Sequence, residues 1–134
     1  MDDIAEILNT CRTVAIVGLS SNPERPSFVV GKYLKEQGYK IIPVNPGEKT
    51  ILGETCYPGL AAVPEKMDVV DIFRKPEDVL PIVRQAIQIG AKAVWMQEGI
   101  INDAAAAEAR QAGLKVVMNT CMRKQHIKLH GGEA

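Results

Sequence analysis

The loop after residue 17 carries the side chains best suited to binding chemistry. Residues 13–17 form an apolar run, Gly18 follows it directly, and a helical pattern begins at Ser27. Free amides at such a strand–turn–helix connection, together with the helix dipole, attract anions, above all phosphate. Gly18 allows close backbone approach, Ser20 offers a hydroxyl group and Arg25 offers a guanidinium group. The candidate ligand residues of this loop are Gly18, Leu19, Ser20, Ser21, Asn22, Pro23, Arg25 and Ser27.

Two features that the sequence lacks limit which phosphate-containing ligands the loop would bind. The loop does not have the Gly-x-Gly-x-x-Gly pattern of dinucleotide-binding folds. The run 40–44 ends at Asn45 and Pro46, where an NAD site would have Asp or Glu for the ribose hydroxyls. Asn45 has no charge to repel a phosphorylated ribose, so such a ribose is tolerated there. Composition alone favours an ordinary turn at Asn45-Pro46, and the missing acidic residue is the informative observation.

Two further apolar runs end in polar or cationic residues, and these add to the candidate site. In an open parallel sheet, ligands bind at the carboxyl ends of the strands. Amide and cationic groups at those ends suit the holding of a nucleotide better than the breaking of a bond, so we assign no catalytic residue. The candidate ligand residues at these two ends are Phe73, Arg74, Met96, Gln97 and Glu98.

Cys121 is the one residue whose surroundings resemble reactive chemistry. Arg123 and Lys124 follow it closely, and nearby cations favour the thiolate form of a cysteine. No base or orienting acid is identifiable from the spacing, so packing is the favoured explanation of this cysteine. We expect His126 and His130 to lie in a solvated basic tail.

The elements that would position these residues alternate between strand and helix. Five runs are apolar almost throughout, which predicts parallel strands covered on both faces: 13–17, 40–44, 69–73, 93–96 and 115–118. Helical patterns lie before the first run and after Ser27, Pro76 and Asn102, whereas 45–67 shows only one turn near 60–63. The sequence predicts an α/β fold, a Rossmann-like three-layer αβα sandwich with strand order 3-2-1-4-5. Gly31 would let its helix pack closely on the first strand.

Bulk properties exclude several classes of function. The chain has 134 residues, which predicts one domain over 1–134. Sixteen basic and sixteen acidic side chains balance, so the charge points neither to nucleic acid nor to a membrane surface. Three widely spaced cysteines predict reduced thiols and a cytoplasmic location, and no Cys-x-x-Cys pair indicates a zinc site.

Several short segments, in this order and spacing, resemble the small stand-alone CoA-binding protein family. That family is related to the N-terminal domain of the succinyl-CoA synthetase α subunit. The resemblance covers nearly the whole chain. The segments are 14–20 with Pro23, 25–27, Gly38-Tyr39, 43–46, Gly53, Tyr57-Pro58, 67–74, 95–99 and Cys121.

The resemblance implies a Rossmann-like domain that holds the CoA diphosphate over the 18–23 loop. It places the adenosine end at Asn45-Pro46 and the pantetheine arm beside Met96, Gln97 and Glu98. Two departures from the family pattern are the Glu48-Lys49 pair and Asn119-Thr120, where relatives have Asp-Arg. The phosphohistidine region of the synthetase has no counterpart here, so ligase activity is not implied.

We therefore expect a protein that binds coenzyme A or an acyl-CoA without a chemical step. Two alternatives stay open. The first is an NADP-dependent oxidoreductase or a nucleotide-binding partner subunit, and the second is a regulatory module that uses the Cys121 thiol. The expected partner is small-molecule CoA, with no nucleic acid and no membrane, and the sequence does not decide between a homo-oligomer and a further protein partner.

Overall fold

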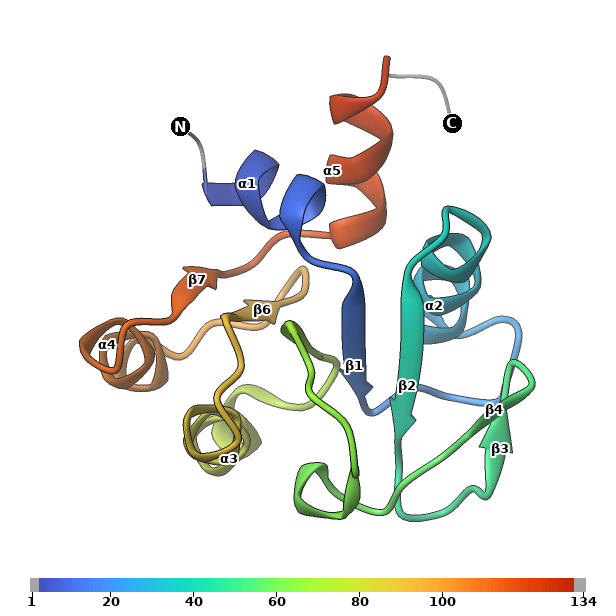
Figure 1. Cartoon of the computed structure of the whole chain (residues 1–134), viewed down its shortest axis with the longest axis horizontal. Coiled ribbons are helices and arrows are strands. Elements are labelled where there is room, and N and C mark those ends of the chain that lie inside the picture. Colours follow the sequence, from blue (N-terminus) through green and yellow to red (C-terminus); the bar gives the residue numbers. More distant parts are fainter. Residues whose placement is uncertain (1–2, 132–134) are drawn as a thin grey trace.

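A five-stranded parallel sheet forms the middle of the molecule (Figure 1). The computed structural model describes residues 3–131. The sheet strands are β1 (Thr13–Val17), β2 (Lys40–Val44), β5 (Val69–Ile72), β6 (Ala93–Met96) and β7 (Lys115–Val117). The helices are α1 (Asp3–Thr10), α2 (Pro26–Glu36), α3 (Val79–Gln88), α4 (Asp103–Gln111) and α5 (Met122–Leu129). Two 3₁₀ turns, η1 (Leu60–Ala62) and η2 (Pro76–Asp78), and a small hairpin of β3 (Thr50–Ile51) and β4 (Glu54–Thr55) complete the chain.

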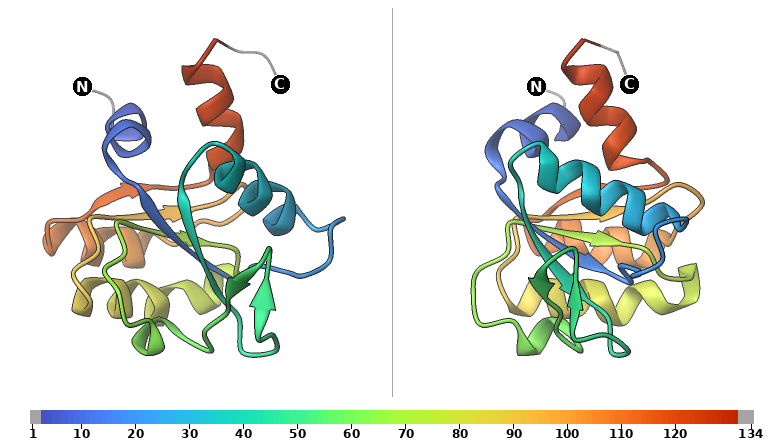
Figure 2. Two further views of the ribbon diagram at one scale, coloured as in Figure 1. Left: turned by 45° about the vertical axis from the view of Figure 1, so that its right-hand side comes forward. Right: turned by 90° about the vertical axis from the view of Figure 1, so that its right-hand side faces the viewer.

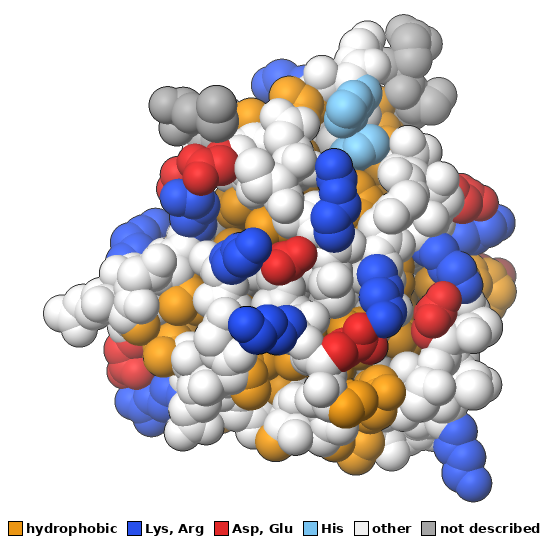
Figure 3. Space-filling model, viewed as in Figure 1, with side chains coloured by type: hydrophobic (Ala, Val, Ile, Leu, Met, Phe, Trp, Pro, Cys, Tyr) orange, Lys and Arg blue, Asp and Glu red, His pale blue; other side chains and the backbone are white. Residues whose placement is uncertain are grey.

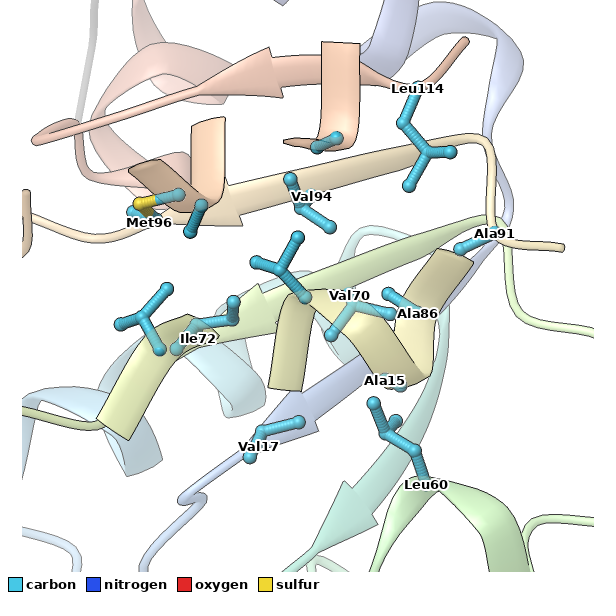
Figure 4. Close-up of a cluster of buried hydrophobic side chains, with 14 of the residues drawn as sticks. Ala15, Val17, Leu60, Val70, Ile72, Ala86, Ala91, Val94, Met96 and Leu114 are labelled. Carbon is cyan, nitrogen blue, oxygen red and sulfur yellow. The ribbon is translucent and has the colours of Figure 1, made fainter. Parts of the chain in front are cut away.

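Both faces of the sheet are covered, as the unbroken apolar runs predict. Helices α1, α2 and α5 lie over one face and α3 and α4 over the other (Figure 2). Alternate strand residues divide between two cores. Figure 4 shows Val70, Ile72 and Val94 of the sheet beside Ala86 of α3 in one core, while Trp95 and its neighbours fill the other. The expected Rossmann-like α/β class is confirmed.

Gly31 lets α2 lie against β1, which confirms the expectation for this residue. A Cβ atom at Gly31 would stand 3.0 Å from Leu19 Cδ1 and 3.4 Å from Ile16 Cδ1. The helix axis is therefore closer to the sheet than any larger residue at this position would allow without repacking.

The expected strand order is wrong. The observed order is β2-β1-β5-β6-β7, which is 2-1-3-4-5 when the five sheet strands are counted along the chain. The expected order 3-2-1-4-5 would place β2 inside the sheet. Pro43 lies within β2 and has no amide hydrogen, so it suits an edge strand and not a central one. Proline was the signal in the sequence that favoured the true order.

Two sets of contacts, one at the outer edge of β2 and one at the start of β1, explain why β5 pairs with β1 and not with β2. Along the outer edge of β2, Tyr57 donates its amide hydrogen to Pro43 O at 3.0 Å and accepts from Asn45 N at 2.9 Å. That edge is therefore occupied. On the opposite side, the Asp68 carboxylate accepts hydrogen bonds from the Arg12 and Thr13 amides at 2.8 and 3.1 Å, which ties the start of β5 to the start of β1.

Two elements were not expected from the sequence. One is the β3–β4 hairpin, whose turn residues Leu52 and Gly53 have φ of 55° and 76°, as a two-residue hairpin turn with two positive φ angles requires. The other is α5, which places His126 in a buried position and so corrects the expected solvated tail. His126 Nδ1 lies 2.7 Å from the Tyr33 hydroxyl, and its ring packs against His130 (Figure 3, pale blue).

The surface shows mixed charge. On the face drawn in Figure 3, acidic and basic side chains alternate and form no large patch of one sign. Within residues 3–131 no helix is long and apolar enough to cross a membrane. The same residues include no cluster of three or more His, Cys, Asp or Glu side chains placed to hold a metal ion.

Replacing Asp68 with Ala should destabilise the fold, because the Arg12 and Thr13 amides lose their acceptor. We expect a loss of about 1–3 kcal/mol in the free energy of unfolding, measured with urea. Burial alone would raise the pKa of Asp68, but the two amides and Lys92 outweigh it and lower that pKa. The stabilisation is therefore present above the ordinary aspartate pKa of about 4 and is lost as the pH falls further.

Lys92→Ala is the matched control for Asp68→Ala. It removes only an ion pair of 3.5 Å from an exposed lysine, so its cost should stay below about 1 kcal/mol. An equal cost for both variants would contradict the role of Asp68 in joining β5 to β1.

Acidification should weaken the packing of α5 through His126. Burial, followed by the nearby His130, lowers the pKa of His126, so the unfolded chain takes up the proton first. The stability advantage of wild type over His126→Gln should therefore shrink as the pH falls below about 6.5. Urea unfolding at pH 7.5 and pH 5.5 measures this difference. The exposed His130 gives the control His130→Gln, and an advantage that does not change with pH in His126→Gln would refute the effect.

Candidate functional site

A cavity of about 770 Å³ opens at the carboxyl ends of the strands. It lies where the connections from β1 and β5 leave the sheet in opposite directions, which is the usual ligand position in open α/β sheets. Ligand pockets typically measure roughly 300–1,000 Å³, so the cavity suits a nucleotide-sized molecule. Its lining residues are Gly18, Ser20, Arg25, Pro26, Ser27, Val30, Asn45, Phe73, Arg74, Lys75, Pro76, Asp78, Gln97, Glu98, Ile100 and Cys121.

Gly18 is required by the fold itself. Its φ of +89° favours glycine, and a Cβ atom there would collide with the Phe73 carbonyl oxygen and lie 3.1 Å from Arg74 Cδ. The close approach made possible by Gly18 is therefore to the end of β5. A bulky residue at 18 would disturb the sheet, so it cannot serve as a clean test of ligand binding.

The loop from Gly18 to Ser27 is held in shape by its own side chains. Ser27 Oγ accepts from the Ser20 amide at 2.9 Å, and Ser20 Oγ accepts from the Asn22 amide at 3.0 Å. Asn22 Oδ1 in turn accepts from the Glu24 amide at 3.0 Å. A loop organised in this way loses little further freedom when a ligand binds.

The first turn of α2 leaves amides available for an anion. Pro26 is the first helical residue, and the first helical amide to bond backward is that of Val29, to Arg25 O at 3.1 Å. Within the described part of the chain, no carbonyl accepts from the amides of Ser27 and Phe28. Ser27 lines the cavity, so this helix end presents donors and partial positive charge to it.

Three cations add charge to the rim. Arg25, Arg74 and Lys75 line the cavity and are exposed, and none of them forms an ion pair with another described residue. The two acidic residues of the lining differ, because Glu98 is paired with Lys124 at 3.0 Å whereas Asp78 has no ion-pair partner among residues 3–131. The rim therefore carries an excess of unpaired positive charge.

Asn45 serves the loop geometry with both of its polar atoms. Nδ2 donates to Leu19 O at 2.9 Å, and Oδ1 accepts from the Gly47 amide at 2.9 Å. The residue ties the turn after β2 to the loop after β1. Asn45 lines the cavity, so an uncharged amide stands where an NAD site would have a carboxylate.

The predicted site residues fall into three groups. The cavity brings together Gly18, Ser20, Arg25, Ser27, Asn45, Phe73, Arg74, Gln97 and Glu98. Leu19 and Met96 point into the two cores and are fully buried. Ser21, Asn22, Pro23 and Pro46 are exposed and lie outside the lining.

Other lining residues were not proposed from the sequence as ligand residues. Val30 and Ile100 give the cavity apolar wall, and they arrive there by the packing of α2 and of the loop after β6. Lys75 was visible as a cation directly after Arg74. Cys121, considered from the sequence only for its thiol, is a free, half-buried cysteine at the N-terminus of α5 that lines the cavity.

Gln97 forms the polar floor of the cavity, and below it lies a buried carboxyl group that the sequence analysis did not single out. Asp71 in β5 is fully buried, and its Oδ1 accepts from Gln97 Nε2 at 2.6 Å. Burial raises the pKa of Asp71 to about 7, against the opposing effect of the hydrogen bond from Gln97. The signal for it was an acidic residue inside an otherwise apolar strand.

Comparisons with known proteins identify the family. A family model described as "CoA binding domain" matches residues 12–127. Among curated proteins, YneT of Bacillus subtilis is 33% identical over 124 residues, which are 92% of each chain. An ADP-forming acetate–CoA ligase of Archaeoglobus fulgidus is 33% identical over 84 residues, which cover 60% of this chain and only 12% of the ligase.

Solved structures agree with these matches. A hypothetical protein of Pyrococcus horikoshii superposes with a TM-score of 0.93 and 46% identity over 96% of this chain and 91% of that one. A dinucleotide-forming acetyl-coenzyme A synthetase of Candidatus Korarchaeum cryptofilum gives a TM-score of 0.73 and 27% identity, over 85% of this chain and 27% of that one. With a family model matched over most of its length and a full-length relative at 33% identity, the chain belongs to the CoA binding domain family.

Proposed function

We propose that the cavity binds coenzyme A or an acyl-CoA. One observation carries this proposal: the unpaired cations Arg25, Arg74 and Lys75 line the same nucleotide-sized cavity as the free helix amide of Ser27. Such a combination is suited to a ligand with several phosphate groups and an extended body. Membership of the CoA binding domain family makes CoA the first candidate.

The proposed pose follows the chemistry of the lining. The diphosphate lies against the amide of Ser27 and the Ser20 hydroxyl, with Arg25 and Arg74 on its outer side. The adenosine end lies towards Asn45. The pantetheine arm runs past Val30 and Ile100, where the apolar wall is, towards the polar floor.

The lining favours binding over catalysis. In the described residues of the cavity, no nucleophile stands within hydrogen-bond distance of a base that a third group orients. We therefore propose that the protein holds its ligand and performs no chemical step on it.

CoA should stabilise the protein more than 3′-dephospho-CoA does. The uncharged Asn45 tolerates the ribose phosphate, and the unpaired cations at the rim favour the additional charge. A ligand at a hundred times its Kd adds about 2.7 kcal/mol to stability, so thermal unfolding detects it readily. NADPH serves as the comparison for the oxidoreductase alternative. A larger shift with NADPH than with CoA would refute the proposal, and equal shifts with both CoA forms would remove the argument from Asn45.

Replacing Arg74 or Arg25 with Gln should weaken CoA binding by about tenfold to a hundredfold. Hydrogen bonds to charged groups contribute about 1.5–3 kcal/mol, and 1.4 kcal/mol corresponds to a factor of ten. Isothermal titration calorimetry measures the affinities. Arg110→Gln is the matched control, because Arg110 is an exposed arginine of α4 outside the cavity. If the control loses as much affinity as the other two, the cations of the rim are not the phosphate ligands.

The thiol alternative is favoured by one observation, the position of Cys121 in the cavity wall. If that alternative holds, the Cys121 thiolate attacks the disulfide of oxidised CoA, forms a mixed disulfide and releases one CoA thiolate. Intact mass spectrometry then shows a gain of one CoA that a reductant reverses and Cys121→Ser abolishes. An unchanged mass in wild type rules the alternative out.

A further inference from the structure

Asp71 occupies a place where a carboxyl group lowers stability. Its neighbours in register are Ile16 on β1 and Trp95 on β6, both fully buried. Oδ2 of Asp71 is enclosed and has no hydrogen-bond partner, and across residues 3–131 it is the one side-chain atom in that condition. No charged side chain offsets the burial that raises the pKa of this group. An apolar residue would fit the strand better.

Because an unsatisfied buried polar group lowers stability, its presence in the strand points to a functional role. Asp71 lies two residues before Phe73 and so faces the same side of β5, directly below a residue of the cavity lining. Its one side-chain partner is Gln97, which also belongs to that lining although it is only 3% exposed. The carboxyl group therefore acts on the cavity through Gln97.

The hydrogen bond to Asp71 determines which end of the Gln97 amide faces the ligand. Oδ1 of Asp71 accepts the hydrogen bond from Gln97 Nε2 at 2.6 Å, so the NH₂ group of Gln97 faces Asp71. Oε1 then points the other way. It has no donor in the described protein and is not among the enclosed unpartnered atoms, so it is open to the cavity.

We propose that Asp71 is a positioning residue for ligand binding, which holds Gln97 so that Oε1 accepts a hydrogen bond from an amide N–H of the pantetheine arm. The inference rests on the proposed function. It extends that function in two ways. Gln97 Oε1 is the atom that contacts the pantetheine arm, and Asp71, which does not touch the ligand, orients that atom.

The test compares two variants of Asp71 with two ligands by isothermal titration calorimetry at pH 7.5. Asp71→Val removes the acceptor, whereas Asp71→Asn keeps a carbonyl oxygen for Gln97. The ligands are CoA and adenosine 3′-phosphate 5′-diphosphate, which has the phosphates but no arm. We expect Asp71→Val to weaken CoA about tenfold and to leave the nucleotide within about twofold, because about 1.4 kcal/mol of hydrogen bonding to the arm is lost. Asp71→Asn should retain most of the CoA affinity.

Thermal unfolding of the same variants separates positioning from structure. Asp71→Val removes the unpartnered Oδ2 but also the acceptor of the buried Gln97 NH₂ group, so the two effects on Tm oppose each other and Tm should change little while the CoA affinity falls. A large fall in Tm, or an equal loss of affinity for both ligands, would indicate a structural role and overturn the inference. So would unchanged CoA affinity in Asp71→Val. If wild type binds the nucleotide and CoA equally, the arm contact fails alone; if it binds neither, the proposed function fails with it.

Discussion

The pairing of β1 with β5 is the constraint on which the rest of the molecule depends. It places the end of β1 so close to the end of β5 that only glycine fits at residue 18. It also creates the point where chain connections diverge and a cavity opens. The Asp68 carboxylate secures this pairing at the far end of both strands, about one strand length from the cavity. Fold and site therefore share one determinant.

Most polar side chains of the cavity loops are engaged with the protein itself. Ser20, Asn22, Ser27 and Asn45 each satisfy a backbone group nearby, so the loop has a defined shape before any ligand arrives. The groups left over are backbone amides, unpaired cations and one amide oxygen of the floor. This division explains how a short loop without the glycine pattern of dinucleotide folds keeps a defined shape: side chains supply the turn geometry that glycines supply elsewhere.

Local patterns predicted most of the elements, and non-local packing decided the rest. Apolar runs located the five sheet strands, and the Asn102 cap located α4, because these signals depend on neighbours in sequence. Strand order depends on which strands pair along their edges, and Pro43 was the one residue whose type indicated that β2 is an edge strand. The α5 helix was missed because its inner face consists largely of Met122 and His126 within a basic stretch. Strand ends likewise located nine of the lining residues, whereas Val30 and Ile100 reach the cavity only through tertiary packing.

The contact between Tyr33 and His126 has a consequence for motion as well as for packing. Tyr33 belongs to α2, whose first turn borders the cavity, and His126 belongs to α5, which begins at the Cys121 wall. One hydrogen bond thus joins the second half of α2 to the middle of α5, and both helices begin beside the cavity. A molecule seated between their first turns would suppress the local opening of both helices together. Slower amide hydrogen exchange would then extend to the far turn of α5, well beyond any atom that the molecule touches.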